Sequence, residues 1–185
     1  MSTVTDRRSE LLDSAVQWVF ANGFAELSLR PLATALKTSD RMLLYYFETK
    51  EQLVSEIAIS AANTLVTLMP SGGPTKSAKS WLDSCWTLYT DDSVRSAMLL
   101  LFELDVLGAR NPEAFGAATT QVADMWIANV HDSLGALGVS GRNRRAVSKV
   151  VAAALVGLVL DTLVRNDSKR PTAELAVLAG LIEGR

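Results

Sequence analysis

The sequence has little of what disulfide and metal sites require. Among its 185 residues, Cys85 is the single cysteine and His131 the single histidine. One cysteine excludes an intramolecular disulfide framework and fits a reducing cytoplasm, and the two residues together do not make a metal-ligand set. Glycine-rich phosphate loops, nucleophile elbows and paired-carboxylate signatures are also missing from the sequence. We therefore expect neither an enzyme nor a cofactor.

A long apolar run is missing as well. The longest run, residues 150–160, is shorter than the roughly 20 residues that span a bilayer. Charged residues such as Arg7, Arg8 and Asp13 surround the first leucines, which excludes the apolar core of a secretory signal. The sequence therefore predicts a soluble cytoplasmic protein without a membrane partner.

Neither sign of charge is in excess, and helix-breaking residues are few. The chain has 18 lysines and arginines against 20 acidic residues, a formal charge of -2. This balance argues against non-specific coating of nucleic acid but leaves room for a local basic edge. With 5 prolines, 11 glycines and 49% hydrophobic residues, the composition predicts an all-α fold with a substantial core.

Apolar residues recur at helical spacing along most of the chain. Asn22-Gly23, Pro70–Pro74, Asn111-Pro112 and Gly138–Gly141 interrupt this pattern and mark turns. The predicted helices cover residues 6–22, 29–36, 40–47, 49–69, 75–90, 93–109, 112–137, 142–165, and 171 or 172 to the end.

Residues 28–53 contain the feature around which the chain is organised, two short helices joined by a tight turn. Ser28 and Ser39 are placed to cap these helices, and Leu43 and Phe47 share one face of the second. Two helices around a turn of three or four residues form a helix-turn-helix unit. The polar start of the second helix suits the major groove of DNA.

A set of apolar, aromatic and polar residues in this stretch forms a pattern that aligns with a known one without insertion or deletion. Its members are Leu32, Ala33, Thr34, Ala35, Leu36, Thr38, Ser39, Leu43, Tyr45, Phe47, Lys50, Glu51 and Leu53. The set resembles the DNA reader of the TetR family of bacterial one-component transcriptional regulators. The resemblance implies a nine-helix, all-α architecture with a DNA-binding domain at 1–50 and a ligand-binding and dimerisation domain at 51–185.

Three departures from the family pattern concern the turn and the reading helix. Lys37 stands where the family usually has glycine, and a left-handed lysine costs about 1–2 kcal/mol. Met42 replaces the threonine that usually touches phosphate, and its thioether cannot donate a hydrogen bond. Leu44 stands at an aromatic position, and Tyr46 stands where histidine is common. The resemblance implies a working reader with an unusual set of contacts.

The resemblance also implies which residues touch DNA. Phosphate contacts fall to Ser28, Tyr45, Tyr46 and Lys50, and base contacts to Arg30, Asp40, Arg41 and Leu44, with Ser39 at the start of the reading helix. Hydroxyls and a lysine suit phosphate oxygens, arginine can bridge the two acceptors of guanine, and aspartate can accept from cytosine. The alternatives are that Ser28 only caps, that Tyr45 only packs, and that Asp40 only stabilises the helix dipole.

The last two helices are apolar on nearly every side and so need cover on every side. The family dimerises through them, and a two-fold dimer presents two readers about 34–36 Å apart. The expected homodimer interface comprises Ala153, Val156, Gly157, Leu160 and Val164 of the eighth helix and Leu175, Leu178 and Ile182 of the ninth. The alternative is that one subunit buries both helices by itself.

The middle helices carry many of the aromatic and methionine side chains. In the family this region encloses a ligand cavity, and such a composition suits an apolar or aromatic small molecule. The predicted lining is Trp81, Cys85, Trp86, Tyr89, Met98, Phe102, Phe115 and Trp126, with Glu103, Asp105 and Asn129 as polar candidates. The alternative for each of these residues is that it belongs to the core.

The sequence thus predicts a ligand-responsive transcriptional regulator, most often a repressor in this family, that binds a palindromic DNA operator as a homodimer. An effector in the body would tilt the fourth helix, change the separation of the readers and release the operator. By linkage, DNA then weakens effector binding by the same factor. The alternative is a helical small-molecule carrier or interaction module with a lapsed reader, which Lys37 and Met42 favour. An enzyme is the least favoured class.

Overall fold

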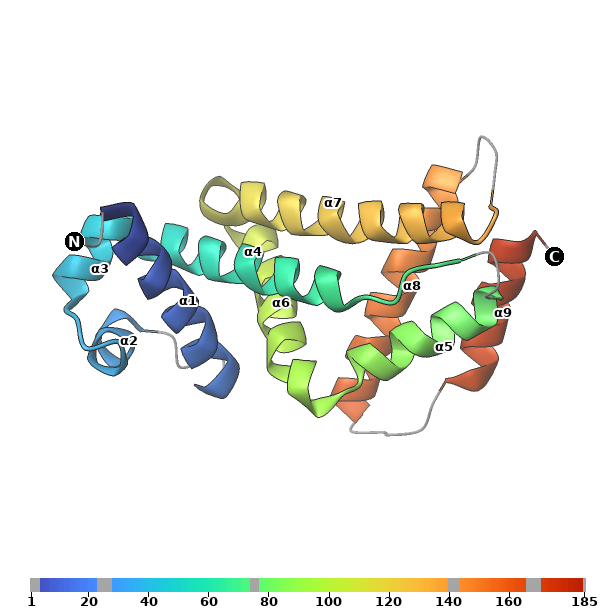
Figure 1. The fold of residues 1–185 in the computed structure, drawn as a ribbon, viewed down its shortest axis with the longest axis horizontal. Coiled ribbons are helices and arrows are strands. Elements are labelled where there is room, and N and C mark those ends of the chain that lie inside the picture. Colours follow the sequence, from blue (N-terminus) through green and yellow to red (C-terminus); the bar gives the residue numbers. More distant parts are fainter. Residues whose placement is uncertain (1–3, 23–27, 74–76, 140–143, 166–170, 185) are drawn as a thin grey trace. The chain divides into compact units, whose positions relative to one another are not determined.

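The computed structural model describes residues 4–22, 28–73, 77–139, 144–165 and 171–184, and all regular structure in these ranges is helical (Figure 1). The helices are α1 (Val4–Asn22), α2 (Leu29–Ala35), α3 (Asp40–Phe47), α4 (Lys50–Leu68), α5 (Ala78–Tyr89), α6 (Asp92–Arg110), α7 (Pro112–Ala136), α8 (Arg144–Arg165) and α9 (Thr172–Glu183). This confirms the expected all-α class with nine helices in the described part of the chain. The glycine expected to end α1, Gly23, lies outside the described residues.

The chain folds into two compact units. Unit 1 comprises residues 1–65 and 95–123, and unit 2 comprises residues 66–94 and 124–185. The domain boundary expected at residue 50 does not coincide with a boundary between these units, because most of α4 belongs with the N-terminal helices. The helix that follows the reader is therefore part of the same compact unit as the reader.

The N-terminal helices of unit 1 enclose a small apolar core. Helix α2 packs against both α1 and α3. The side chains that fill this core are at most 5% exposed, and they recur at helical spacing. They are Leu11, Ala15, Val16 and Val19 of α1, Leu32 and Ala33 of α2, and Leu43 and Phe47 of α3. This confirms the expectation that Leu43 and Phe47 lie on the buried face of α3.

Helix α2 ends in a left-handed residue that is not glycine. Lys37 has a φ of 53°. Its N–H donates to Thr34 O at 3.2 Å, and the N–H of Thr38 donates to Ala33 O at 2.9 Å. These two bonds form a Schellman motif, which satisfies carbonyls that the helix end leaves without partners. The turn therefore has the geometry that glycine usually serves, with a lysine in its place.

Replacing Lys37 with glycine should stabilise the protein. Glycine adopts positive φ without steric conflict, whereas lysine pays about 1–2 kcal/mol there. Part of this gain is lost to the greater freedom of glycine in the unfolded chain, so Lys37→Gly should raise the free energy of unfolding by about 0.5–1 kcal/mol. Urea unfolding measures the change. Thr38→Gly is the control, because the neighbouring Thr38 does not have a positive φ, and it should lower the free energy of unfolding. A lower free energy of unfolding for Lys37→Gly would contradict the inference that the backbone of Lys37 is strained.

The caps of the reader differ from one helix to the next. Ser39 Oγ accepts from Met42 N at 3.2 Å, which confirms the cap expected for α3. Thr49 Oγ1 accepts from Gln52 N at 3.0 Å and begins α4 in the same way. Ser28 has the extended backbone of an N-cap, but its side chain makes no capping hydrogen bond. The cap expected from Ser28 is therefore not formed.

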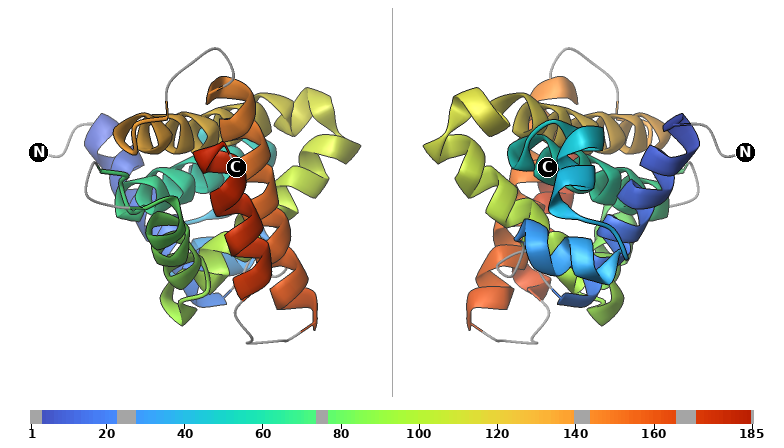
Figure 2. Two further views of the ribbon diagram at one scale, coloured as in Figure 1. Left: turned by 90° about the vertical axis from the view of Figure 1, so that its right-hand side faces the viewer. Right: turned by 90° about the vertical axis from the view of Figure 1, so that its left-hand side faces the viewer.

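Three helices of unit 2 lie side by side. Helix α5 packs against α9 and α8, and α8 packs against α9, as both views show (Figures 1 and 2). Their shared core consists of Trp81, Leu82 and Cys85 of α5, Val151, Leu155 and Val159 of α8, and Leu175, Leu178 and Ile182 of α9. Each helix buries one stripe here and leaves its opposite face to solvent.

The segment after α4 passes close to the end of α7. A Cβ added to Gly72 would lie 2.0 Å from the carbonyl oxygen of Ser133, so only glycine fits at this position without a backbone shift. The indole Nε1–H of Trp81 donates to Pro70 O at 2.8 Å. These contacts fix the course of the described part of the break between α4 and α5.

Candidate nucleic-acid interface

Helix α3 has one buried and one exposed face. Leu43 and Phe47 have no exposed surface, whereas Tyr45 is 66% exposed. The other predicted contacts also lie at the surface. Ser28, Arg30, Ser39, Asp40, Arg41, Leu44, Tyr45 and Lys50 are exposed and Tyr46 is half-buried. The structure therefore leaves every predicted DNA contact accessible, and their contacts with DNA remain predictions.

The exposed side chains of α3 lie at helical spacing from its N-terminus. Asp40 and Arg41 occupy its first turn, and Leu44 and Tyr45 follow one turn later. The rings of Tyr45 and Tyr46 meet edge to face, with centroids 5.2 Å apart. A guanidinium at the tip and phenol hydroxyls further along place base-reading and phosphate-binding chemistry on one short helix.

Two of the alternatives for single residues can be compared with the structure. Ser28 does not act as a side-chain cap, so capping does not account for it. Tyr45 is too exposed to serve mainly as a packing residue. Asp40 stands in the first turn of α3, where a carboxylate favours the helix dipole, so its structural role and its proposed base contact are compatible.

The predicted pocket residues are divided between the two units. Trp81, Cys85, Trp86, Tyr89 and Trp126 are buried in unit 2, whereas Met98 and Phe115 are buried in unit 1 and Phe102 is half-buried there. The rings of Tyr89 and Trp126 meet edge to face at 5.6 Å. The Tyr89 hydroxyl donates to Met69 Sδ at 3.3 Å. Burial, and to a lesser extent Cys85, raises the pKa of Tyr89 well above its ordinary value.

The three polar candidates differ in their surroundings. Glu103 is half-buried, and burial raises the pKa of its carboxyl. Asp105 is exposed on α6. Asn129 Oδ1 on α7 is buried and has no hydrogen-bond partner among the described residues. A buried carbonyl oxygen without a donor is unusual in a folded protein, and it could accept a hydrogen bond from a bound molecule.

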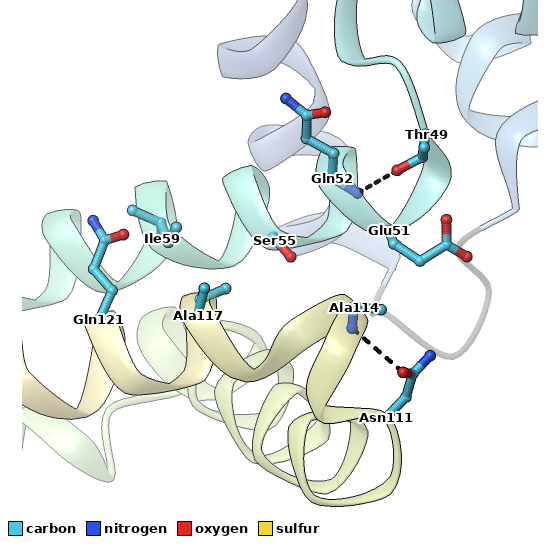
Figure 3. Close-up of a pocket in the computed structure, with 10 residues that line it drawn as sticks. Thr49, Glu51, Gln52, Ser55, Ile59, Asn111, Ala114, Ala117 and Gln121 are labelled. Carbon is cyan, nitrogen blue, oxygen red and sulfur yellow. Dashed lines mark hydrogen bonds between the residues drawn. The ribbon is translucent and has the colours of Figure 1, made fainter.

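A groove in unit 1 was not expected from the sequence. It has a volume of about 580 Å³ and lies between the start of α4 and the first half of α7 (Figure 3). Its lining is Thr49, Glu51, Gln52, Ser55, Ile59, Asn111, Ala114, Ala117, Ala118 and Gln121. None of the predicted pocket residues contributes to it. The spacing of its three alanines on one face of α7 is the sequence signal that could have indicated it.

The predicted dimer residues fall into two groups. On α8, Ala153, Gly157, Leu160 and Val164 are exposed and Val156 is half-buried. On α9, by contrast, Leu175, Leu178 and Ile182 are buried in the core that α9 shares with α5 and α8. The exposed large apolar side chains of α9 are Val177 and Leu181. These two replace the three expected residues as the α9 surface that is open to a partner.

Comparison with known proteins agrees with this arrangement. The family model described as "Bacterial regulatory proteins, tetR family" matches residues 11–57, from α1 into α4. The DNA reader of this chain belongs to the TetR family. The HTH-type nicotine-responsive transcriptional repressor HdnoR of Paenarthrobacter nicotinovorans is 28% identical to this chain over 129 residues. That match spans 67% of this chain and 65% of the length of that relative.

Solved structures of similar fold extend over nearly the whole chain. A transcriptional regulator from Rhodococcus sp. Rha1 has a TM-score of 0.74 at 14% identity, with 96% of each chain covered. The multidrug binding protein EbrR, complexed with imidazole, has a TM-score of 0.71 at 20% identity and covers 95% of this chain and 94% of its own. At these identities the likeness concerns the fold alone, and it extends beyond the reader to nearly the whole chain.

Proposed function

We propose that this TetR-family protein represses transcription by binding a palindromic operator as a homodimer, and that a small apolar or aromatic effector releases it. The observation that carries the proposal is the two-sided character of α3. Leu43 and Phe47 anchor the helix in a closed core, while Arg41 and Tyr45 stand in solvent. A helix held rigidly from behind and polar in front suits insertion into the major groove.

Specificity is expected from the arginines and general affinity from the hydroxyls and lysine. Arg30 and Arg41 are exposed near the starts of α2 and α3, and each can make a bidentate contact with guanine. Tyr45 and Tyr46 lie towards the other end of α3 and Lys50 begins α4. Contacts of these residues with phosphate oxygens would hold α3 in register. Because the formal charge of the chain is -2, affinity for random DNA should be modest.

Two substitutions should separate these roles. Arg41→Ala should relax the preference for one base pair by about 1–3 kcal/mol and leave affinity for random duplex largely intact. Lys50→Ala should weaken binding to all DNA sequences alike and should reduce the salt dependence of binding by the equivalent of about one phosphate contact. The measurement is selection of the operator from a random duplex library, followed by titrations of both variants at several salt concentrations. A wild-type protein that selects no sequence would contradict the proposed function.

Dimerisation through α8 is supported by the apolar surface that this helix exposes. Val150 is 52% exposed and Val164 is 76% exposed. By length and composition alone α8 could cross a membrane, with a mean hydropathy of 2.0, although the apolar run at its centre was expected to be too short. A second copy of the same helix would cover this surface in water, and Val177 and Leu181 of α9 would extend the contact.

An aromatic nitrogen compound is the first class of effector to test. Two observations support it besides the aromatic side chains of the body. The relative HdnoR is named as nicotine-responsive, and the structural neighbour EbrR is a multidrug binding protein complexed with imidazole. Asn129 Oδ1 offers a buried acceptor that no donor in the described part of the chain occupies. Such an effector should weaken operator binding, and operator DNA should weaken effector binding by the same factor.

A further inference from the structure

The connection between α3 and α4 is a strained turn. Only Glu48 and Thr49 separate the two helices. Glu48 has a φ of 59° and a ψ of -57°, and the N–H of Thr49 donates to Phe47 O at 2.6 Å. This is a γ-turn of the positive-φ kind, which is rare because it is sterically unfavourable. Such a conformation persists only where surrounding contacts hold it.

One side chain from α1 makes contacts on both sides of this turn. Arg8 Nε–H donates to Tyr46 O at 3.0 Å, and its guanidinium lies 4.8 Å from the centre of the Phe47 ring. On the other side of the turn, Arg8 Nη2 donates to Glu56 Oε1 of α4 at 2.5 Å. Arg8 thus joins the last turn of α3 to α4 across Glu48. We call this set of contacts the Arg8 clamp.

The chemistry of the clamp favours a role in geometry over a role in stability. Tyr46 O belongs to the last turn of α3, where carbonyls have no partner in the helix and the dipole attracts a cation. The ion pair of Arg8 with Glu56 is partly solvated, with side chains 35% and 22% exposed, and such pairs add little net stability. A planar guanidinium can nevertheless hold three groups in fixed directions at once, which an ammonium cannot.

We propose that Arg8 is a positioning residue that fixes the angle between α3 and α4 and so presents the reading face of α3 to the operator. The proposal rests on the proposed function, because it concerns how the same DNA reader is held. Arg8 acts through Tyr46, Phe47 and Glu56 and not through a contact with DNA. It precedes the residues that the family model matches, which begin at Leu11.

Arg8→Lys tests the proposal, with Arg7→Lys as its matched control. Both substitutions keep the charge, and among the described residues Arg7 pairs only with Glu10 of its own helix. Arg8→Lys should weaken operator binding about tenfold, the order expected for a lost charge-assisted hydrogen bond. Affinity for random duplex and the salt slope should stay unchanged, because they depend on charge. Arg7→Lys should leave all three unchanged.

A second measurement reports the turn without DNA. The amide of Thr49 donates within the γ-turn, so its hydrogen exchange should become faster in Arg8→Lys, while the amide of buried Ile57 in α4 exchanges as in wild type. Glu56→Gln keeps an acceptor for Arg8 but removes its charge, and it should change both measurements in the same direction by less. It replaces Arg8→Lys if that variant does not fold.

Three outcomes would decide against the clamp. Operator binding at the wild-type level by folded Arg8→Lys would overturn it, as would equal weakening of operator and random duplex, which indicates a phosphate contact. Unchanged exchange of Thr49 would also overturn it. If the wild-type protein selects no operator, the proposed function fails, and hydrogen exchange alone still decides whether Arg8 holds the turn.

Discussion

Leu160→Glu is expected to convert the regulator into a monomer and to reduce operator affinity at least about 100-fold, because binding to two half-sites at once is lost. Leu160 lies on the exposed apolar face of α8 and is 41% exposed in the single chain. The subunit should therefore still fold, since the new carboxylate faces water there. In a dimer the carboxylate would be desolvated beside its own copy, which is strongly unfavourable. Light scattering after size-exclusion chromatography and operator titration measure the two effects.

Leu99→Glu is the matched control for this prediction. Leu99 is a leucine of α6 that is 40% exposed, so the substitution adds the same charge at the same degree of exposure. It should leave the dimer and its operator affinity in place. A Leu160→Glu protein that remains dimeric would show that α8 is not the interface. A monomeric Leu160→Glu protein with wild-type operator affinity would contradict the need for two readers.

Trp81→Ala should lower the free energy of unfolding by about 3–5 kcal/mol, a large share of the stability of a typical domain. Trp81 has no exposed surface, and its indole N–H donates to Pro70 O. The substitution would leave a cavity in unit 2 and a carbonyl without its donor. Chemical denaturation monitored by circular dichroism measures the loss. The result distinguishes the core from the predicted pocket lining, the two possibilities that the sequence left open for this residue.

Trp81→Phe provides the comparison. It keeps an aromatic ring and loses the hydrogen bond, so the destabilisation should be clearly smaller, at about 1–3 kcal/mol. A Trp81→Ala protein with nearly normal stability but altered affinity for an aromatic effector would instead place Trp81 in a ligand cavity. Effector binding to this variant would be measured by the intrinsic fluorescence of the remaining tryptophans.

The course of the helices could be predicted because local signals agreed with the final structure. Pro112 begins α7, Ser39 caps α3, and the apolar spacing of α1 matches its buried side. The unusual turn at Lys37 was also predictable, since the family resemblance placed a residue with positive φ there. Its Schellman hydrogen bonds are complete despite the lysine, which weakens one of the two reasons for considering a lapsed reader.

Other features depend on contacts that the sequence does not indicate. Helix α9 is apolar on most sides, so its sequence could not tell Leu178, which faces α5 and α8, from Val177, which faces solvent. The γ-turn at Glu48 contains no glycine that would have indicated a positive φ in the sequence. Arg8 meets Tyr46 and Glu56 across 38 and 48 positions of sequence, and only the packing of α1 brings them together.

Lys37, in the turn before α3, affects both the stability of the protein and its affinity for DNA. Glycine at position 37 would relax the backbone but contribute no charge to a reader whose positive and negative groups nearly cancel. Lysine supplies an exposed positive charge beside the start of the reading helix, but its backbone is held in a less favourable conformation than that of glycine would be. A variant selected for heat resistance at this position would accordingly tend to hold DNA less tightly, and one selected for tighter repression would tolerate the strain.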